Sequence, residues 1–187
     1  YTITYKDGDK IYTEDYEAGD SVAWKSDITK KGYTLVGWKY NDKEYNLSDK
    51  FTMINEDITV TSIWNVNKYI ITYEVNGGSI NNKTKEVIYD SKYGTLDVPG
   101  KKGYTFKGWY KENGFISMVD ENTIVSEDKD HILYAKWEIN SYKLTIDAGI
   151  NTNEYTLKYN DEKEIVIPEI KGYSFVKWNI TGTDSSI

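Results

Sequence analysis

One ten-residue pattern occurs three times in this chain, and this repetition constrains the fold more than any other feature. The copies read KKGYTLVGWK, KKGYTFKGWY and IKGYSFVKWN, at residues 30–39, 101–110 and 170–179. Their Gly-Tyr pairs lie 71 and then 69 residues apart. A near-constant spacing is typical of a tandem-repeat protein. We therefore expect a series of similar small modules along the chain.

A second pair of matching segments sets the expected boundaries. SIWNVN at 62–67 matches AKWEIN at 135–140, and a strand-like segment restarts after each of them. These landmarks predict three units, at residues 1–67, 68–140 and 141–187. The third unit lacks a counterpart of the last strand of the other two. We expect it either to keep an open sheet edge or to pair with another chain through 141–187.

The order of apolar residues within a unit predicts a mainly β fold. Tyr1, Ile3 and Tyr5 alternate with polar residues, as in a strand with one buried face. DGD at 7–9 and NGG at 76–78 predict hairpin turns, because type I′ turns require a positive φ at both central positions. Further strands are expected near residues 11–17, 58–64, 85–90, 131–137 and 155–159, and one helical turn is expected within 92–99.

The charge and the absence of cysteine exclude several classes of function. The chain has 23 basic residues, all of them lysine, against 30 acidic ones, for a net charge of −7. Without arginine or a basic cluster, nucleic acid is not an expected partner. The absence of cysteine excludes disulfides, thiolate catalysis and thiolate metal sites. No long apolar run predicts membrane insertion of this fragment, and we expect a signal and an anchor to lie elsewhere in a longer protein.

Nothing in the sequence predicts catalytic residues, a cofactor or a metal. The single histidine, His131, stands at the start of a predicted strand, where the first unit has Ile58, and is expected to be structural. Acidic residues gather at 120–130 and at 7–15, which raises the alternative of calcium binding. Calcium requires six to eight converging oxygen ligands, and the spacing of a calcium loop is absent. These acids are expected to be solvated.

The tryptophans of the repeated pattern leave two alternatives open. If the strand is regular, Trp38, Trp109 and Trp178 lie on the outer face and are candidate ligand contacts that could stack on sugar rings. If a β-bulge occurs at Gly37 and Gly108, the alternation reverses and the indoles are buried. The second arrangement is the favoured one.

Residues 89–137, with GYTFKGWY and LYAKW, resemble the Listeria–Bacteroides repeat. The first unit has TVTSIW in place of the closing motif, and Lys177 replaces the motif glycine in the third. The resemblance implies small β-grasp-like modules in tandem, similar to the B-repeat of internalin-type surface proteins, without catalytic residues. Its structural motif would comprise Gly32, Tyr33, Trp64, Gly103, Tyr104, Phe106, Trp137, Gly172 and Tyr173.

Together these features predict a non-enzymatic tandem-repeat segment of a bacterial cell-surface or secreted protein. Short links between units, at 65–67 and 138–140, favour an adhesive or semi-rigid stalk role at the cell wall of a Gram-positive bacterium. The expected partner is a host or neighbouring-cell surface protein or a glycan. The alternatives are a carbohydrate-binding module that uses the Gly-Trp pairs, and an accessory domain of a surface hydrolase.

Overall fold

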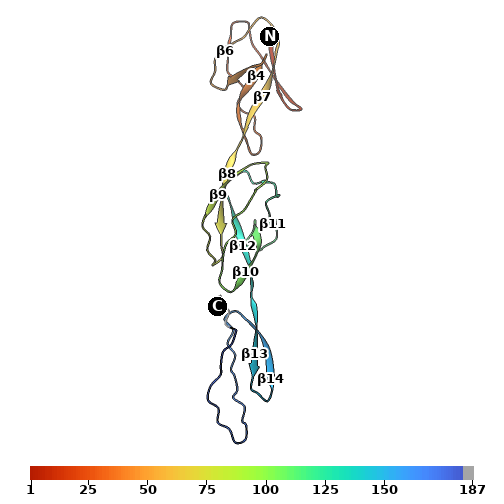
Figure 1. Cartoon of the computed structure of the whole chain (residues 1–187). Coiled ribbons are helices and arrows are strands. Elements are labelled where there is room, and N and C mark those ends of the chain that lie inside the picture. Colours follow the sequence, from red (N-terminus) through yellow and green to blue (C-terminus); the bar gives the residue numbers. More distant parts are fainter. Residues whose placement is uncertain (183–187) are drawn as a thin grey trace. The chain divides into compact units, whose positions relative to one another are not determined.

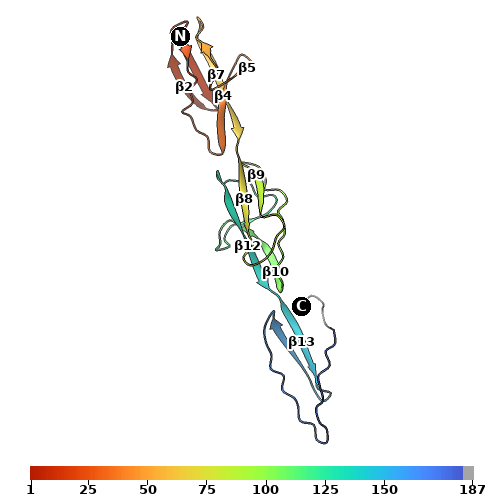
Figure 2. The same cartoon turned by 90° about the vertical axis from the view of Figure 1, so that its left-hand side faces the viewer.

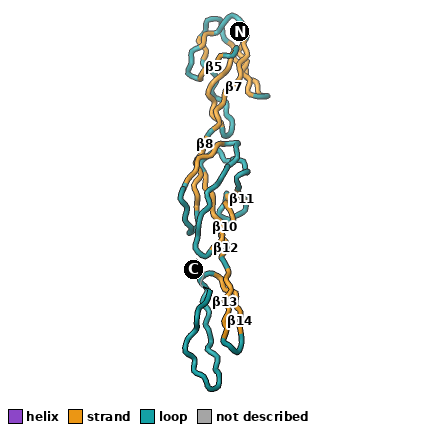
Figure 3. Tube along the Cα trace, viewed as in Figure 1, coloured by secondary structure: helices purple, strands orange, loops and turns teal. Residues whose placement is uncertain are grey.

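The computed structural model describes residues 1–182, and every regular element in this part of the chain is a β-strand (Figures 1 and 3). It contains no helix that could span a membrane. The strands are β1 Thr2–Asp7, β2 Lys10–Asp15, β3 Ser21–Val22, β4 Tyr33–Tyr40, β5 Lys43–Asn46, β6 Phe51–Thr52, β7 Ile58–Val66, β8 Lys68–Glu74, β9 Thr84–Ile88, β10 Tyr104–Tyr110, β11 Met118–Val119, β12 His131–Ile139, β13 Ser141–Asp147 and β14 Thr152–Lys158.

The described residues form four sheets, three of which follow one another along the chain, and this confirms a β fold of small tandem sheets. The first has the strand order β2-β1-β7-β4-β5, and the second has the order β11-β10-β12-β8-β9. β13 and β14 form a two-stranded sheet, and β3 pairs with β6. Contacts group the chain into two compact units. One holds 1–71, 84–94 and 121–131, and the other holds 72–83, 95–120 and the chain from Ile132 onward.

The first sheet is built around β7, its central strand. β7 runs parallel to β1, with Ile3 opposite Ile58 and Tyr5 opposite Val60, and antiparallel to β4. The predicted alternation holds, because Ile3, Tyr5, Ile58 and Val60 are all buried. The loop tryptophan Trp24 closes the same core. The full core comprises Ile3, Tyr5, Val22, Trp24, Ile28, Trp38, Met53, Ile58 and Val60.

The second sheet repeats this order, with β12 between β10 and β8 (Figure 2). Ile71, Leu133 and Ala135 are fully buried in it. Asn76 at φ 47° and Gly77 at φ 82° have the positive φ values of a type I′ turn, but they begin a nine-residue connection, 75–83, between β8 and β9 and do not form a two-residue hairpin loop.

The predicted helical turn within 92–99 is wrong. A β-bridge joins Lys92 to Ile124, and the backbone N–H of Tyr93 donates to the Thr123 carbonyl at 2.9 Å. These long-range backbone bonds replace the local bonds that a helical turn would need.

The third sheet is a hairpin and no more. β13 pairs with β14 from Ser141↔Lys158 to Asp147↔Thr152, and residues 159–182 form no strand (Figure 3). No side chain within 141–182 is buried. This segment therefore contains the pattern of a repeat without a packed core.

Candidate functional site

The motif tryptophans of the first two sheets lie in the core. Trp38 is 0% exposed and Trp109 is 2% exposed. Their indole N–H groups donate to backbone carbonyls, Trp38 to Lys25 at 2.8 Å and Trp109 to Asp97 at 2.9 Å. Burial, the favoured alternative, is therefore confirmed for these two residues, and the alternative of exposed sugar-stacking rings does not hold for them.

A β-bulge reverses the alternation in both strands. The pairing shifts between Leu35 and Gly37 in β4, and between Phe106 and Gly108 in β10. After the bulge, the tryptophan side chain lies on the face opposite to the one that it would occupy in a regular strand. Glycine is needed there because a Cβ on Gly37 would lie 1.9 Å from the Tyr45 carbonyl oxygen.

Trp178 differs from the other two motif tryptophans. It is half-buried, and its ring lies 5.2 Å from the ring of Phe175. Lys177 stands where the other copies have glycine, and the segment forms no strand. Its indole is the one member of the series that remains partly accessible.

The closing tryptophans are half-buried and are anchored through their indole N–H groups. Trp64 donates to the Asp7 carboxylate at 2.8 Å, and Trp137 donates to the Val75 carbonyl at 2.8 Å. The Ser62 hydroxyl also donates to Asp7, at 2.8 Å. In the first sheet a titratable group thus occupies the position that a backbone carbonyl occupies in the second.

The environment of Asp7 favours its charged form. Partial burial alone would raise its pKa. The hydrogen bonds from Ser62 and Trp64, with the positive charges of Lys30 and Lys10, outweigh that effect and hold the pKa of Asp7 below its usual value. The Asp7 carboxylate is therefore a hydrogen-bond acceptor within the first sheet, and this role is lost when the carboxylate is protonated at low pH.

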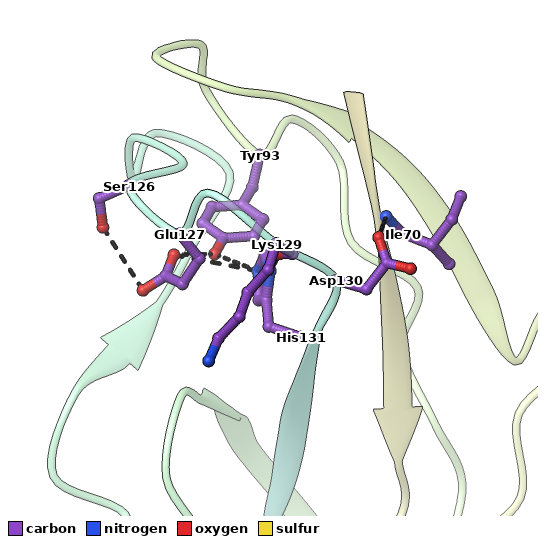
Figure 4. Close-up of polar contacts among 7 residues, drawn as sticks. All are labelled: Ile70, Tyr93, Ser126, Glu127, Lys129, Asp130 and His131. Atoms are coloured by element: carbon purple, nitrogen blue, oxygen red, sulfur yellow. Dashed lines mark hydrogen bonds and ion pairs between the residues drawn. The ribbon is translucent and has the colours of Figure 1, made fainter. Parts of the chain in front are cut away.

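His131 belongs to a cluster that joins two loops (Figure 4). The Tyr93 hydroxyl lies 2.7 Å from His131 Nε2 and donates to Glu127 at 3.1 Å. His131 Nδ1 lies 3.0 Å from the Lys129 carbonyl. The adjacent Asp130 accepts the backbone N–H of Ile70 at 2.8 Å.

The tyrosine hydroxyl of this cluster is enclosed, whereas His131 and Glu127 are half-buried. Tyr93 is 2% exposed, so a substrate has no access to its hydroxyl. Burial, and next the negative charge of Glu127, raise the pKa of Tyr93 and keep its proton in place. We infer that the cluster fixes the loop around residue 93 to the loop around residue 127.

No group of three or more His, Cys, Asp or Glu side chains that could hold a metal lies within residues 1–182. The two acidic stretches singled out in the sequence do not converge there. Asp7 accepts hydrogen bonds within its own sheet, and Asp130 bonds a backbone N–H.

The most specific arrangement lies at Asn67, the single residue between β7 and β8. Its backbone N–H donates to the Gly32 carbonyl at 2.9 Å, and its own carbonyl accepts the Tyr89 N–H at 3.0 Å. Its side-chain oxygen accepts the Thr34 hydroxyl at 2.6 Å. The junction at Asn67 is thus bonded through both its main chain and its side chain.

A tyrosine ring covers the motif glycine at this junction. Gly32 has a φ of 74°, and a Cβ built on it would lie 2.1 Å from the ring of Tyr89. The same ring packs edge-on against Tyr33, with centroids 5.8 Å apart. The Tyr33 hydroxyl donates to Asp90 at 3.3 Å. Only glycine permits this approach, because any side chain would occupy the space of the ring.

The junction at Asn140, between β12 and β13, repeats this arrangement. The Asn140 N–H donates to the Gly103 carbonyl at 2.9 Å, and its carbonyl accepts the Tyr159 N–H at 2.9 Å. A Cβ on Gly103, at φ 76°, would lie 2.0 Å from the Tyr159 ring. Tyr104 packs edge-on against that ring at 6.3 Å. Because the same geometry occurs at both junctions, it is a recurrent structural feature of the repeat.

The third copy of the motif has no such covering. Gly172 keeps a positive φ of 84°, but no atom among the described residues lies within 4 Å of a Cβ built there. Tyr173 is 81% exposed.

The repeated sequence motif includes Gly32, Tyr33, Gly103 and Tyr104 but not their partners. Those partners are Asn67, Tyr89, Asn140 and Tyr159. The available signal was the shared final asparagine of WNVN and WEIN, together with a tyrosine directly after the second strand of the next hairpin.

The all-β fold and the repeated junctions place this chain in the class of tandem-repeat proteins. The sequence matches the Listeria-Bacteroides repeat domain at residues 1–62 and 69–136. The chain belongs to this family.

Relatives extend the comparison. Two proteins of Evansella cellulosilytica, named as a Gly-rich membrane protein and a membrane protein, are 35% and 33% identical over 93% and 95% of this chain. The chain spans 21% and 27% of their lengths. Internalin H of Listeria monocytogenes is 38% identical over 44% of the chain and 15% of its own length. Streptococcal SHIRT domains 3-4 from a cell surface protein align with 75% of this chain and 98% of theirs, at 14% identity and a TM-score of 0.24.

Proposed function

We propose that this chain is a non-enzymatic, semi-rigid spacer segment of a bacterial cell-surface or secreted protein. Its repeat units would be 1–67, 68–140 and 141–187. The observation that carries the proposal is the paired junction geometry at Asn67 and Asn140, where a tyrosine ring lies on the motif glycine of the preceding sheet.

The junctions restrict rotation because they leave little backbone free. A flexible linker needs several residues without fixed partners. Here only one residue separates β7 from β8, and both its N–H and its carbonyl are hydrogen-bonded. A rotation about Asn67 would break these bonds and would also move the Tyr89 ring away from Gly32.

The spacer role is preferred to the carbohydrate-binding alternative because of the burial of two motif tryptophans. Adhesion through the Gly-Trp pairs would require exposed rings, and those of Trp38 and Trp109 are buried. Placement at the cell surface is supported by similarity to internalin H and to two membrane proteins. The single histidine, His131, is half-buried and lies within hydrogen-bond distance of the Tyr93 hydroxyl and the Lys129 carbonyl, which supports a structural role for it.

Distance measurements by pulsed electron paramagnetic resonance would test this proposal. The chain has no native cysteine, so label pairs can be introduced without background. One pair, Asp9→Cys with Thr84→Cys, reports on the junction at Asn67. A second pair, Asn113→Cys with Asn153→Cys, reports on the junction at Asn140. All four positions are exposed.

We expect one narrow distance distribution for each pair. A control pair within the first sheet, Asp9→Cys with Glu44→Cys, gives the width that a single folded sheet produces. Distributions across the junctions several times broader than this control would overturn the spacer proposal.

A further inference from the structure

Two asparagine-glycine pairs occur in the chain, at residues 76–77 and 113–114. Each pair forms the centre of a β-turn that a main-chain hydrogen bond closes. The bond that closes the turn at 75–78 is 3.0 Å long, and the bond that closes the turn at 112–115 is 2.9 Å long. The two pairs therefore share their residue types and a closed turn, and they differ in what surrounds them.

An asparagine followed by glycine is chemically reactive, because glycine has no side chain that would block its own backbone nitrogen. That nitrogen can attack Cγ of the asparagine and close a five-membered succinimide ring. The bond between Cγ and Nδ2 breaks, and Nδ2 leaves as ammonia with the proton of the attacking N–H. Water then opens the ring at either carbonyl, which leaves an aspartate or an isoaspartate. The net reaction exchanges ammonia for water and needs no enzyme.

The fold holds Asn76 away from this reaction. Its Nδ2 donates to the Ala135 carbonyl in β12 at 2.8 Å, and its own carbonyl accepts Lys101 Nζ at 2.9 Å. Its backbone N–H donates to Glu74 Oε1 at 3.0 Å. To bring its Cγ to the nitrogen of Gly77, the side chain would have to give up the bond to β12. Because Asn76 is half-buried, water would not fully replace that bond.

Asn113 has no comparable restraint. Its side chain is exposed, as is Gly114, and within residues 1–182 no hydrogen bond holds its carboxamide. Apart from the chain neighbours of Gly114, the nearest atom to a Cβ built on it is 4.0 Å away. Both residues lie in the loop between β10 and β11. The carboxamide can therefore rotate toward the nitrogen of Gly114 without the loss of a contact to another strand.

We propose that Asn113 is a site of spontaneous deamidation and that the fold protects Asn76 from the same reaction. Water is the co-reactant, and the product carries a new carboxylate beside Glu112. This inference does not depend on the spacer role, because it concerns one loop of the second sheet and no junction.

The isoaspartate product would loosen the loop in which it forms. An isoaspartate adds one methylene group to the main chain, which changes the spacing between the Glu112 carbonyl and the Phe115 N–H. The Phe115 ring packs edge-on against Tyr110, with centroids 5.6 Å apart, and Lys136 Nζ lies 5.7 Å from the centre of the same ring. These contacts would be released with the turn. Deamidation at Asn113 would thus change the second sheet with time and leave the first sheet unaltered.

Peptide mapping of the intact chain after incubation at mildly alkaline pH tests the proposal. We expect conversion at Asn113 to be at least tenfold faster than at Asn76. Part of the product should be isoaspartate, which a succinimide gives and direct hydrolysis of the side chain does not. Equal rates at the two sites, or faster conversion at Asn76, would overturn the proposal.

The same measurement in concentrated urea separates the effect of the fold from that of the local sequence. The unfolded chain keeps both asparagine-glycine pairs but loses the bonds of Asn76 to Ala135 and Lys101. We expect the two rates to converge under these conditions. A tenfold difference that persists in urea would show that neighbouring residues decide the rates, and it would refute the protection of Asn76 by the fold.

Gly114→Ala is the matched variant for the chemical route. The φ of Gly114 is not positive and the space beside it is open, so we expect the melting temperature to be unchanged. The added methyl group hinders the attacking nitrogen, and deamidation at Asn113 should become at least tenfold slower. An unchanged rate in this variant would rule out attack by the nitrogen of residue 114 and with it the proposed reaction.

Hydrogen exchange of the isoaspartate form, isolated by chromatography, tests the loosening of the loop. We expect exchange at residues 112–117 to be faster than in the unconverted chain, with no change at 1–67. Equal exchange at 112–117 in the two forms would contradict the structural consequence of the modification.

Discussion

The same motif glycine occurs three times with a positive φ, but its surroundings differ. A tyrosine ring covers Gly32 and Gly103, whereas the space above Gly172 is open. Backbone conformation alone therefore explains why glycine is needed at Gly172. At Gly32 and Gly103, the contact with the ring is a second and independent requirement.

Substitution at these positions can separate the two effects. Both Gly32→Ala and Gly172→Ala place a Cβ in the left-handed region, which costs about 1–2 kcal/mol. Only Gly32→Ala also displaces a ring, that of Tyr89. We expect it to broaden the Asp9–Thr84 label distances, while Gly172→Ala leaves them unchanged. Equal widths in the two variants would show that the ring does not hold the junction.

Asp7 makes the first sheet more sensitive to acid than the second. Its pKa is lower in the folded chain than in the unfolded chain. Its contribution to stability is therefore complete above the unfolded pKa and is lost as the pH falls below about 4. We expect Asp7→Asn to reduce the fall in melting temperature between pH 5 and pH 3, measured by circular dichroism.

Asp9→Asn, at the exposed turn beside it, is the matched control for this effect. The second sheet provides another comparison, because Trp137 donates to a backbone carbonyl that does not titrate. An acid response of Asp7→Asn identical to that of the unsubstituted chain would argue against this role for the carboxylate.

At the scale of the elements, the bulges in β4 and β10 decide which face the tryptophan occupies. Gly37 lies where a Cβ would meet the Tyr45 carbonyl oxygen at 1.9 Å, although its φ is not positive. We expect Gly37→Ala to force β4 and β5 apart and to lower the free energy of unfolding of the first sheet by about 1–3 kcal/mol. Urea unfolding followed by tryptophan fluorescence measures this change.

Gly100→Ala is the control for that substitution. The nearest atom to a Cβ at Gly100 is 4.0 Å away, and its φ is also not positive. It should change stability by less than about 0.5 kcal/mol. If both substitutions had equally small effects, the close approach of the two strands would not be what requires glycine.

The long strands were predictable from local pattern, whereas the short strands β3, β5, β6 and β11 and the contacts between strands were not. Alternation placed Ile3 and Tyr5 correctly on the buried face of β1, although Tyr1 is exposed, and NGG has the predicted positive φ values but not the predicted hairpin loop. The sequence left the faces of Trp38 and Trp109 open, because a bulge adds one residue to one strand and depends on what the opposite strand permits. The contact of Tyr89 with Gly32 joins residues far apart in the chain, and its only sequence signal is that the asparagine and the tyrosine recur in the next unit.

At the scale of the whole molecule, packing is unevenly distributed along the chain. Residues 1–140 contain every buried side chain of the described part, and 141–182 contain none. Repetition in the sequence predicted three units, but it did not predict how strongly each would pack. A small sheet acquires a core only when a central strand brings both faces of the pattern together.

This difference predicts where a protease cuts the intact chain. Cleavage requires a segment of backbone to enter the protease in extended form, so paired strands must open first. Lys163, Lys171 and Lys177 are exposed and lie outside any strand, whereas Lys39 and Lys107 are exposed but lie within paired strands. With dilute trypsin, we expect cleavage at the first three sites to be at least tenfold faster.

The product should be a fragment that retains the first two sheets and the β13–β14 hairpin, identified by intact mass. The hairpin should survive longer than residues 160–182, because Tyr159 is held to Asn140 and lies over Gly103. Substitution of Tyr159 by alanine removes that ring, and cleavage should then extend to Lys158 and Lys143. If trypsin cut Lys39 or Lys107 as fast as Lys171, the two complete sheets would be no more stable than the incomplete one, and the central strand could not be what distinguishes them.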